Sequence, residues 1–245
     1  MTRSGTHYGP LPEHLADVQL PDDAGAPVLV YFHGGGLESG DKADASGLVE
    51  RLVPAGVGVV SAAYRLYPEA RFPDFVEDAA TCVAWVRHTW PDRPLLVGGS
   101  SAGAYLAMMM CFDERWLAAA GADVADVVGW VFDAGQPTTH FNVLRERGLD
   151  PRRVVVDEAS PLYHVGTRGE LAPVLLVLAS EDVAGRLEQT NVLLATLREL
   201  GLAERVRVEV MEGYQHSAYL GEPEGLSRFA DLALELVRRS VAAAT

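Results

Sequence analysis

The chain has 245 residues, 49% of them hydrophobic, and carries 34 acidic against 20 basic side chains, a formal net charge of −14. This length and composition suit one globular domain with a buried core, and we expect a single domain over residues 1–245. The acidic balance repels nucleic acids and anionic lipids, so we expect neither a nucleic-acid partner nor a membrane partner.

Other absences in the sequence narrow the class of protein further. Cys82 and Cys111 both lie in apolar stretches, which is typical of small core residues in a reducing cytoplasm. The first 20 residues contain no apolar run of the signal-peptide kind, and no stretch approaches the roughly 18 apolar residues of a membrane span. No Cys/His cluster has metal-ligand spacing. We expect a cytoplasmic protein without a metal or cofactor.

Strands and helices alternate along the chain. Runs of β-forming residues predict strands at 27–32, 57–63, 94–98, 127–132, 173–180 and 205–211. Helical spacing of apolar residues predicts helices at 46–56, 74–90, 101–112, 185–200 and 226–241. The alternation predicts an α/β fold with a mostly parallel central sheet and helices on both faces. Ligand sites in such sheets lie at the carboxyl ends of strands, so functional residues should follow the apolar runs.

The stretch 133–172 is irregular in this pattern. It follows a predicted strand on the side where functional residues gather, and it carries His140, Phe141 and Arg145. We expect this excursion to wall a substrate pocket, and an Arg145 that faced the pocket would favour a substrate with a carboxylate. The competing interpretation is a lobe that packs on the surface.

A Gly-x-Ser-x-Gly pattern at Gly99, Ser101 and Gly103 joins a predicted strand to a predicted helix. A nucleophile at so sharp a turn needs small residues two positions away on each side, because larger side chains would collide. Centring the pattern on Ser100 would place Ala102 at the second position, which fits less well. We predict Ser101 as a nucleophile; the competing interpretation is a glycine-rich turn whose serine caps the helix.

A serine hydroxyl needs a general base, and the base needs an orienting carboxylate. In chains with this motif the acid and then the histidine follow the serine. His216 lies in a loop directly after the strand at 205–211, on the correct side of the sheet, whereas His164 precedes a strand. The strand at 173–180 is followed at once by Glu181 and Asp182, and either carboxylate could orient an imidazole. The Ala-x-x-Asp spacing favours Asp182.

A glycine run, His33 to Gly36, follows the first clear strand. Glycines allow a substrate to approach the backbone closely, and backbone N–H groups stabilise the anion that forms on a carbonyl oxygen during acyl transfer. We predict an oxyanion hole formed by the N–H groups of Gly34, Gly35 and Ala102. His33 is expected to brace the loop by hydrogen bonds.

Together these motifs resemble the hormone-sensitive-lipase-like family of α/β-hydrolases. The resemblance rests on HGGG at 33–36, YRLYPEARFPDFVEDAATCVAWV at 64–86, GGSSAGAYLA at 98–107, and ASPLY at 159–163 leading into LLVLASED. It implies the α/β-hydrolase fold and esterase chemistry, with Ser101, Asp182 and His216 as the catalytic triad. It also implies structural roles for Glu69 and Asp78.

The chain departs from this family in three respects. The first clear strand begins at Pro27, so we expect no full N-terminal cap. Ser100 precedes the nucleophile where the family usually has aspartate, and the histidine loop begins His216-Ser217 rather than His-Gly. The short layout also resembles kynurenine formamidases.

We therefore expect a serine hydrolase that cleaves a small carboxylic ester. The sequence leaves open an amidase or formamidase acting on an amide of the N-formylkynurenine type, and an acyl-elimination lyase that uses the same triad. A ligand-binding module that has lost catalysis is the interpretation from a different class of protein. Homodimer formation through an edge strand or helix is an expectation by analogy with capless relatives.

Overall fold

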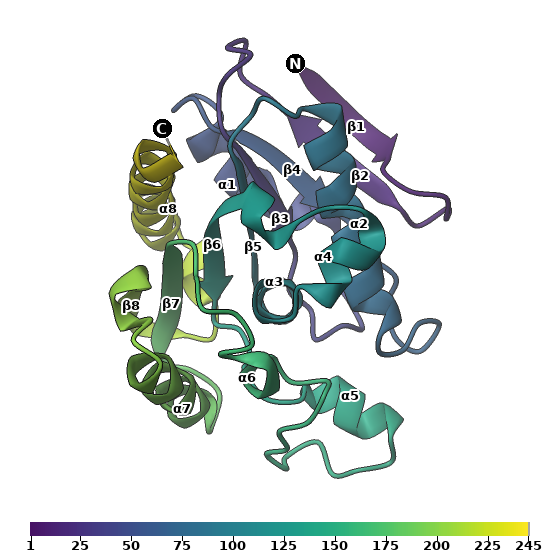
Figure 1. Cartoon of the computed structure of the whole chain (residues 1–245), viewed down its shortest axis with the longest axis vertical. Coiled ribbons are helices and arrows are strands. Elements are labelled where there is room, and N and C mark those ends of the chain that lie inside the picture. The colour runs from purple at the N-terminus through teal and green to yellow at the C-terminus, as the bar shows by residue number, and fades with distance from the viewer. Residues whose placement is uncertain (245) are drawn as a thin grey trace.

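The computed structural model describes residues 1–244 of the chain. At its centre is an eight-stranded sheet in the order β1-β2-β4-β3-β5-β6-β7-β8 (Figure 1). β1 (Thr2–His7) and β2 (Leu15–Gln19) form an antiparallel hairpin, and β2 also pairs antiparallel with β4. The other six strands, β3 to β8, run parallel to one another. The sheet is mostly parallel, as predicted.

All six predicted strands are present, and only the last extends well beyond its predicted end. They are β3 (Val28–Phe32), β4 (Gly58–Ala62), β5 (Leu95–Ser100), β6 (Val127–Asp133), β7 (Val174–Glu181) and β8 (Val206–Gln215). The five predicted helices are α1 (Ser46–Leu52), α2 (Asp74–Thr89), α3 (Ala102–Phe112), α7 (Arg186–Glu199) and α8 (Pro223–Ala244). Three short helices were not predicted: α4 (Arg115–Ala120), α5 (Phe141–Glu146) and α6 (Pro161–His164). No helix among residues 1–244 is long and apolar enough to span a lipid bilayer.

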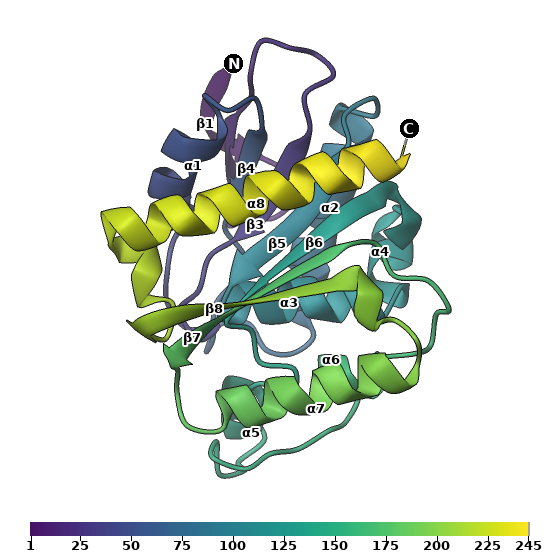
Figure 2. The ribbon, with the colours of Figure 1, turned by 90° about the vertical axis from the view of Figure 1, so that its left-hand side faces the viewer.

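Helices cover both faces of the sheet, with α1 and α8 on one face and α2, α3 and α7 on the other (Figures 1 and 2). Side chains of a strand alternate between these two layers because successive residues point to opposite faces. On β3, Leu29 and Tyr31 pack under α1 and α8, whereas Val28, Val30 and Phe32 pack under α2 and α3. This two-sided burial accounts for the continuous apolar runs from which the strands were predicted.

The segment before β3 adds a hairpin to the sheet. Neither β1 nor β2 is an apolar run, so neither strand was predicted from the sequence. The side chains of β1 are almost all exposed, and those of β2 alternate between partly and fully buried positions. Both strands are held by backbone pairing, β1 to β2 and β2 to β4.

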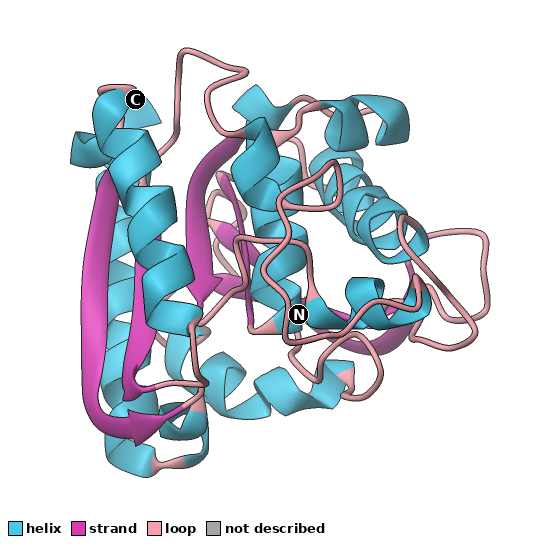
Figure 3. Cartoon of the chain, turned by 90° about the horizontal axis from the view of Figure 1, so that it is seen from below, coloured by secondary structure: helices cyan, strands magenta, loops and turns pink. Residues whose placement is uncertain are grey.

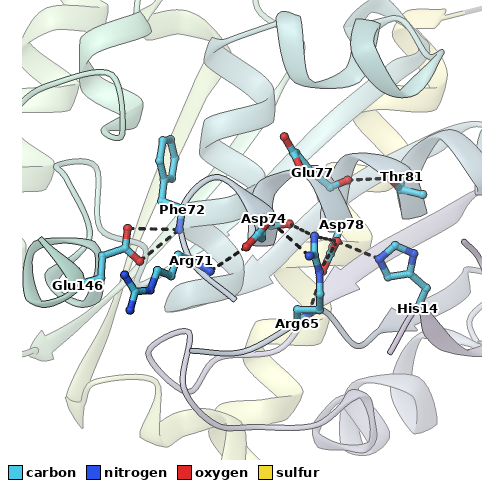
Figure 4. Close-up of polar contacts among 9 residues, drawn as sticks. All are labelled: His14, Arg65, Arg71, Phe72, Asp74, Glu77, Asp78, Thr81 and Glu146. Carbon is cyan, nitrogen blue, oxygen red and sulfur yellow. Dashed lines mark hydrogen bonds and ion pairs between the residues drawn. The ribbon is translucent and has the colours of Figure 1, made fainter. Parts of the chain in front are cut away.

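Asp78 ties this hairpin to α2 (Figure 4). Its buried carboxylate lies 2.9 Å from His14 Nε2, at the start of β2, and accepts hydrogen bonds from the Arg65 guanidinium at 2.7 and 2.8 Å. The Arg65 backbone N–H adds a further bond at 2.9 Å. One buried carboxylate thus joins three segments, which agrees with a structural role for Asp78. Glu69, in contrast, is exposed.

The excursion at 133–172 contains α5 and α6. These helices lie near α7 at the lower end of the molecule in Figure 1, the end onto which Figure 3 looks. Loops that follow the carboxyl ends of the parallel strands also gather there. The excursion is therefore placed where it can contact the predicted site.

Candidate active site

Ser101 occupies the turn between β5 and α3. Its backbone has φ 52° and ψ −109°, a conformation that residues with side chains rarely adopt. A Cβ atom on Gly99 would lie 2.5 Å from the carbonyl carbon of Gly103, and one on Gly103 would lie 2.0 Å from the carbonyl oxygen of Phe32. Glycine is therefore required on both sides of the serine. The Ser101 N–H donates to the carbonyl oxygen of Asp133 at 2.7 Å, which holds the strained turn.

His216, which follows β8, lies between the serine and a carboxylate. Its Nε2 atom is 2.8 Å from Ser101 Oγ, and its Nδ1 atom is 2.5 Å from Asp182 Oδ1. The Asp182 side chain is 2% exposed and that of His216 is 25% exposed. An imidazole with its proton on Nδ1 donates to Asp182 and accepts from Ser101. The structure thus places the three predicted residues in one hydrogen-bonded chain.

The neighbouring acid, Glu181, lies elsewhere. It is the exposed last residue of β7 and pairs in register with Gln215 of β8. The imidazole of His216 contacts Asp182, whose Oδ1 atom also accepts the N–H of Val183 at 2.7 Å. The carboxylate in contact with the histidine is therefore the one that the Ala-x-x-Asp spacing favoured.

The glycine loop lies against the serine. A Cβ atom on Gly34 would be 3.4 Å from Ser101 Cβ, and one on Gly35, which has φ +106°, would overlap the carbonyl oxygen of Ser39 at 2.1 Å. Among residues 1–244, no acceptor is found for the N–H groups of Gly34, Gly35 and Ala102. Ala102 is the first residue of α3, where an N–H group has no partner within the helix. Free N–H groups beside a serine suit a developing oxyanion.

His33 stabilises the glycine loop by a hydrogen bond and a ring contact. Its Nδ1–H donates to the carbonyl oxygen of Gly34 at 2.7 Å, and its ring stacks on Tyr64 with the centroids 4.4 Å apart. The Tyr64 hydroxyl donates to the His33 carbonyl oxygen at 2.9 Å. Burial lowers the pKa of His33, so the ring is neutral near pH 7. These contacts agree with a bracing role.

Helix α5 of the excursion packs on the other side of the glycine loop. Asn142 Nδ2 donates to the carbonyl oxygen of Gly36 at 2.9 Å, and the Phe141 ring occupies the space that a side chain on Gly36 would need. Arg145 Nη1 lies 2.5 Å from Glu38 Oε2, and both side chains are about two-fifths exposed. The charge of Arg145 is therefore already paired with that of Glu38.

His140 is buried beneath Phe141. Its ring contacts Tyr105 and Phe141, with centroids 5.1 and 4.3 Å away. Its Nδ1 atom accepts the N–H of Asn142 at 3.2 Å, and burial lowers the pKa of His140 to about 3. The three residues predicted to line a pocket thus gather beside the glycine loop, with His140 as a neutral packing residue.

A buried carboxylate that was not predicted, that of Asp133, lies at the end of β6. The residue is 0% exposed, and its Oδ1 atom accepts a hydrogen bond from the Tyr219 hydroxyl. Ser217 Oγ lies 3.5 Å from Oδ2 and accepts from Ser100 Oγ at 3.0 Å. Burial raises the pKa of Asp133 to about 6, although the nearby hydroxyl groups of Ser100 and Tyr219 oppose the shift. The signal available in the sequence was an acidic residue that closes a strand beside the nucleophile's strand.

A buried cation near the triad was missed as well. Arg186, the first residue of α7, is 5% exposed, and its Nε and Nη1 atoms have no hydrogen-bond partner among residues 1–244. Burial lowers the pKa of Arg186 to about 10, while the nearby Asp182 carboxylate opposes that shift. Nothing in the sequence around Arg186, which lies four residues after Asp182, indicates that this side chain is buried.

The geometry defines a class of site. A hydroxyl backed by an imidazole and a carboxylate, beside free backbone N–H groups, can attack a carbonyl carbon and stabilise the resulting oxyanion. Among the described residues, no group of three or more His, Cys, Asp or Glu side chains could hold a metal ion. The fold and this geometry are those of an α/β-hydrolase.

Comparison with known proteins agrees with that class. The family model described as the alpha/beta hydrolase fold matches residues 29–131, which include the glycine loop and Ser101. This match and the relatives below support the hormone-sensitive-lipase-like esterase family that the motifs resemble.

Two relatives from Mycobacterium tuberculosis match most of the chain. "Carboxylic ester hydrolase LipN" is 34% identical over 206 residues, which are 71% of this chain and 54% of that protein. "Esterase LipC" is 30% identical over 224 residues, 80% of this chain and 55% of that protein. The chain thus spans about half the length of these relatives.

Solved structures share the fold over nearly the whole chain. Esterase B from Lactobacillus rhamnosis superimposes with a TM-score of 0.80 at 17% identity, covering 99% of this chain and 87% of that one. Esterase 2 from Thermogutta terrifontis gives a TM-score of 0.78 at 20% identity, covering 98% and 94%. At these identities the likeness shows the fold.

Proposed function

We propose that this chain is a carboxylic ester hydrolase in which Ser101 is the nucleophile, His216 the general base and Asp182 the orienting acid. The observation that carries the proposal is the continuous hydrogen-bonded chain through these residues, with contacts of 2.8 and 2.5 Å. Because Ser101 heads α3 at a positive φ, its hydroxyl stands free of the helix.

In the first half of the reaction Ser101 Oγ attacks the ester carbonyl carbon while His216 Nε2 accepts the hydroxyl proton. Asp182 keeps the imidazole in the required tautomer and stabilises its positive charge. The N–H groups of Gly34, Gly35 and Ala102 donate to the oxyanion. One such donor typically contributes about 3 kcal/mol to lowering the barrier.

Collapse of this intermediate breaks the bond to the alcohol oxygen, which takes the proton from His216. The products of this half are the alcohol and an ester of Ser101. In the second half His216 removes a proton from water, which attacks the acyl carbon. The acid then leaves, and the Ser101 hydroxyl regains its proton from His216.

The choice of an ester as substrate draws on the relatives. LipN is named a carboxylic ester hydrolase and LipC an esterase, and one solved structure of Thermogutta terrifontis Est2 is described as butyrate-bound. For this chain we propose esters with short acyl groups. Helix α5 supports this choice, because it crowds the glycine loop through Phe141 and Asn142.

The test is hydrolysis of p-nitrophenyl esters from acetate to octanoate, with N-formylkynurenine as the competing amide. We expect the highest kcat/KM on acetate or butyrate and loss of turnover in Ser101→Ala. Faster cleavage of N-formylkynurenine than of every ester would make the chain a formamidase. Retention of ester turnover by Ser101→Ala would refute the assignment of the nucleophile.

A further inference from the structure

Asp133 contacts both the nucleophile's backbone and the loop that carries the base. Its carbonyl oxygen accepts the Ser101 N–H at 2.7 Å. Its carboxylate accepts hydroxyl groups from Ser217 and Tyr219, the first and third residues after His216. No other residue of the site is bonded to both elements in this way among residues 1–244.

Side-chain hydrogen bonds join the histidine loop to the ends of β5 and β6. From Ser217 to Gly221, every side-chain hydrogen bond that the structure describes ends on Asp133 or on its neighbour Ser100. Ser217 has φ 52°, so the chain turns sharply at the residue after the histidine. A hydrogen-bonded anchor at that residue fixes the direction in which the preceding imidazole points.

The ring of Tyr219 is fixed by packing, and this holds rigid the anchor, by which we mean the hydrogen bonds of Ser217 and Tyr219 to Asp133. Its side chain is 0% exposed, and its ring packs between Tyr214 and Phe229, with centroids 5.8 and 6.2 Å away. The hydroxyl thus reaches Asp133 from a ring held by β8 and α8. Displacing the carboxylate would leave a buried hydroxyl without its acceptor, which is costly.

We propose that Asp133 is a positioning residue whose carboxylate holds the loop of His216 in register with Ser101, so that the imidazole meets the serine hydroxyl. The inference rests on the proposed function. In this proposal Asp133, at the end of β6, aligns Ser101, which follows β5, with His216, which follows β8.

A purely structural role would not need a charge at this place. Three hydroxyl groups besides that of Ser217 face the carboxylate, those of Tyr31 from β3, Ser100 from β5 and Tyr219. The charged groups near it are the imidazole of His216 and its partner Asp182. Burial raises the pKa of Asp133, so ionisation is disfavoured there. A neutral amide of the same size would avoid that penalty. It would also lose one of the two hydroxyl acceptors, because an amide nitrogen cannot accept.

The informative variant is therefore Asp133→Asn, with Tyr219→Phe and Ser217→Ala removing the donors singly. Misplacing a catalytic group by about 1 Å costs roughly 100-fold in rate. We expect kcat on p-nitrophenyl butyrate to fall by about 10- to 100-fold in Asp133→Asn and by about 10-fold in Tyr219→Phe, with KM changed by less than about threefold.

Titration of the reactive serine with a fluorophosphonate separates positioning from folding. Loss of folded protein lowers the number of labelled sites but leaves kcat per labelled site unchanged, whereas poor positioning lowers kcat per site. The matched control is Asp113→Asn, which removes another buried carboxylate, bonded to Arg115 at 2.8 Å. The control should keep its kcat per site.

The proton NMR resonance of the His216 Nδ1–H, shifted to low field by Asp182, reports the loop without requiring turnover. We expect it to broaden or move in Asp133→Asn and to stay in place in Asp113→Asn. A wild-type protein that neither hydrolyses esters nor labels Ser101 would refute the proposed function, and the resonance would still test the anchor. Wild-type kcat per site together with an unmoved resonance in Asp133→Asn would overturn the positioning role.

Discussion

The Nε2 atom of His216 lies 2.8 Å from the Oγ atom of Ser101, although 115 positions separate the two residues along the chain. The contact forms because β5 and β8 are parallel strands of one sheet and end at the same edge. The glycine loop after β3, Asp133 at the end of β6 and Asp182 after β7 meet at this edge as well. The topology thus assembles the site from five strand ends.

The backbone strain at Ser101 predicts a trade-off between stability and activity. Ser101→Gly should be more stable than Ser101→Ala by about 1 kcal/mol, because only glycine adopts a positive φ without cost. Both variants should lose ester turnover by at least about 1000-fold. Urea denaturation measures the first difference. Equal stability of the two variants would contradict the strain argument.

Asp133 predicts a pH-dependent stability. Its pKa is raised from 3.8 to about 6, so the native state binds this proton more tightly than the unfolded chain does. The resulting stability is fully present below about pH 4 and is lost as the pH rises through 6, a change of about 3 kcal/mol. Because an asparagine side chain does not titrate, the free energy of unfolding of the wild type minus that of Asp133→Asn should fall by about this amount.

The measurement is urea denaturation of both proteins at several values between about pH 4 and pH 7, because titrating groups remote from Asp133 cancel in the difference. A difference that stays constant over this range would mean that the Asp133 carboxylate ionises at its ordinary pKa.

The unpaired guanidinium of Arg186 predicts a stabilising substitution. A buried charge without a hydrogen-bonded partner costs free energy, and the lowered pKa of Arg186 reflects that cost. Arg186→Met keeps an unbranched apolar stem and should raise the free energy of unfolding by about 1–3 kcal/mol. Denaturation in guanidinium chloride near pH 7 tests this. Destabilisation by more than about 1 kcal/mol would show that the charge is satisfied in solution.

The contact between α5 and the glycine loop predicts a loss of rate. Asn142→Ala removes the 2.9 Å hydrogen bond to the Gly36 carbonyl and should loosen the loop that carries the proposed oxyanion donors Gly34 and Gly35. We expect kcat to fall by about 10-fold on p-nitrophenyl butyrate. Arg147→Ala, which breaks an exposed pair with Asp157 at the end of the same helix, is the control and should keep its rate. If Asn142→Ala and Arg147→Ala had equal kcat values, the contact of α5 with the glycine loop would not contribute to the rate.

The sequence predicted the parts of this structure that carry local signals. Apolar runs predict the strands from β3 to β7 because both faces of the sheet are buried there, whereas the alternation of RVRVEVM predicts the edge strand β8. The spacing of Gly99, Ser101 and Gly103 predicts the turn because the close contact of its two glycines is a local constraint. The edge strand β1 could not be found in this way, since its exposed side chains carry no period and only its pairing with β2 defines it.

Side-chain contacts between residues far apart in the chain could not be predicted from the sequence either. Arg145 was expected at a pocket, but its partner Glu38 lies 107 positions earlier in the chain, at the end of the glycine loop. Asp133 is visible as an acid that ends a strand, yet the hydroxyl that it binds on Tyr219 lies 86 positions later. Such pairs follow from the packing of the folded chain and not from any periodicity.

Ser100 and Ser101 are adjacent, so the proposed mechanism requires that the reactive serine be located. The protein should be treated with a fluorophosphonate, digested, and the modified residue located by tandem mass spectrometry in the wild type and in His216→Ala. We predict an adduct on Ser101 in the wild type and little or none in His216→Ala. An adduct on Ser100, or ester turnover without any adduct on Ser101, would contradict the account.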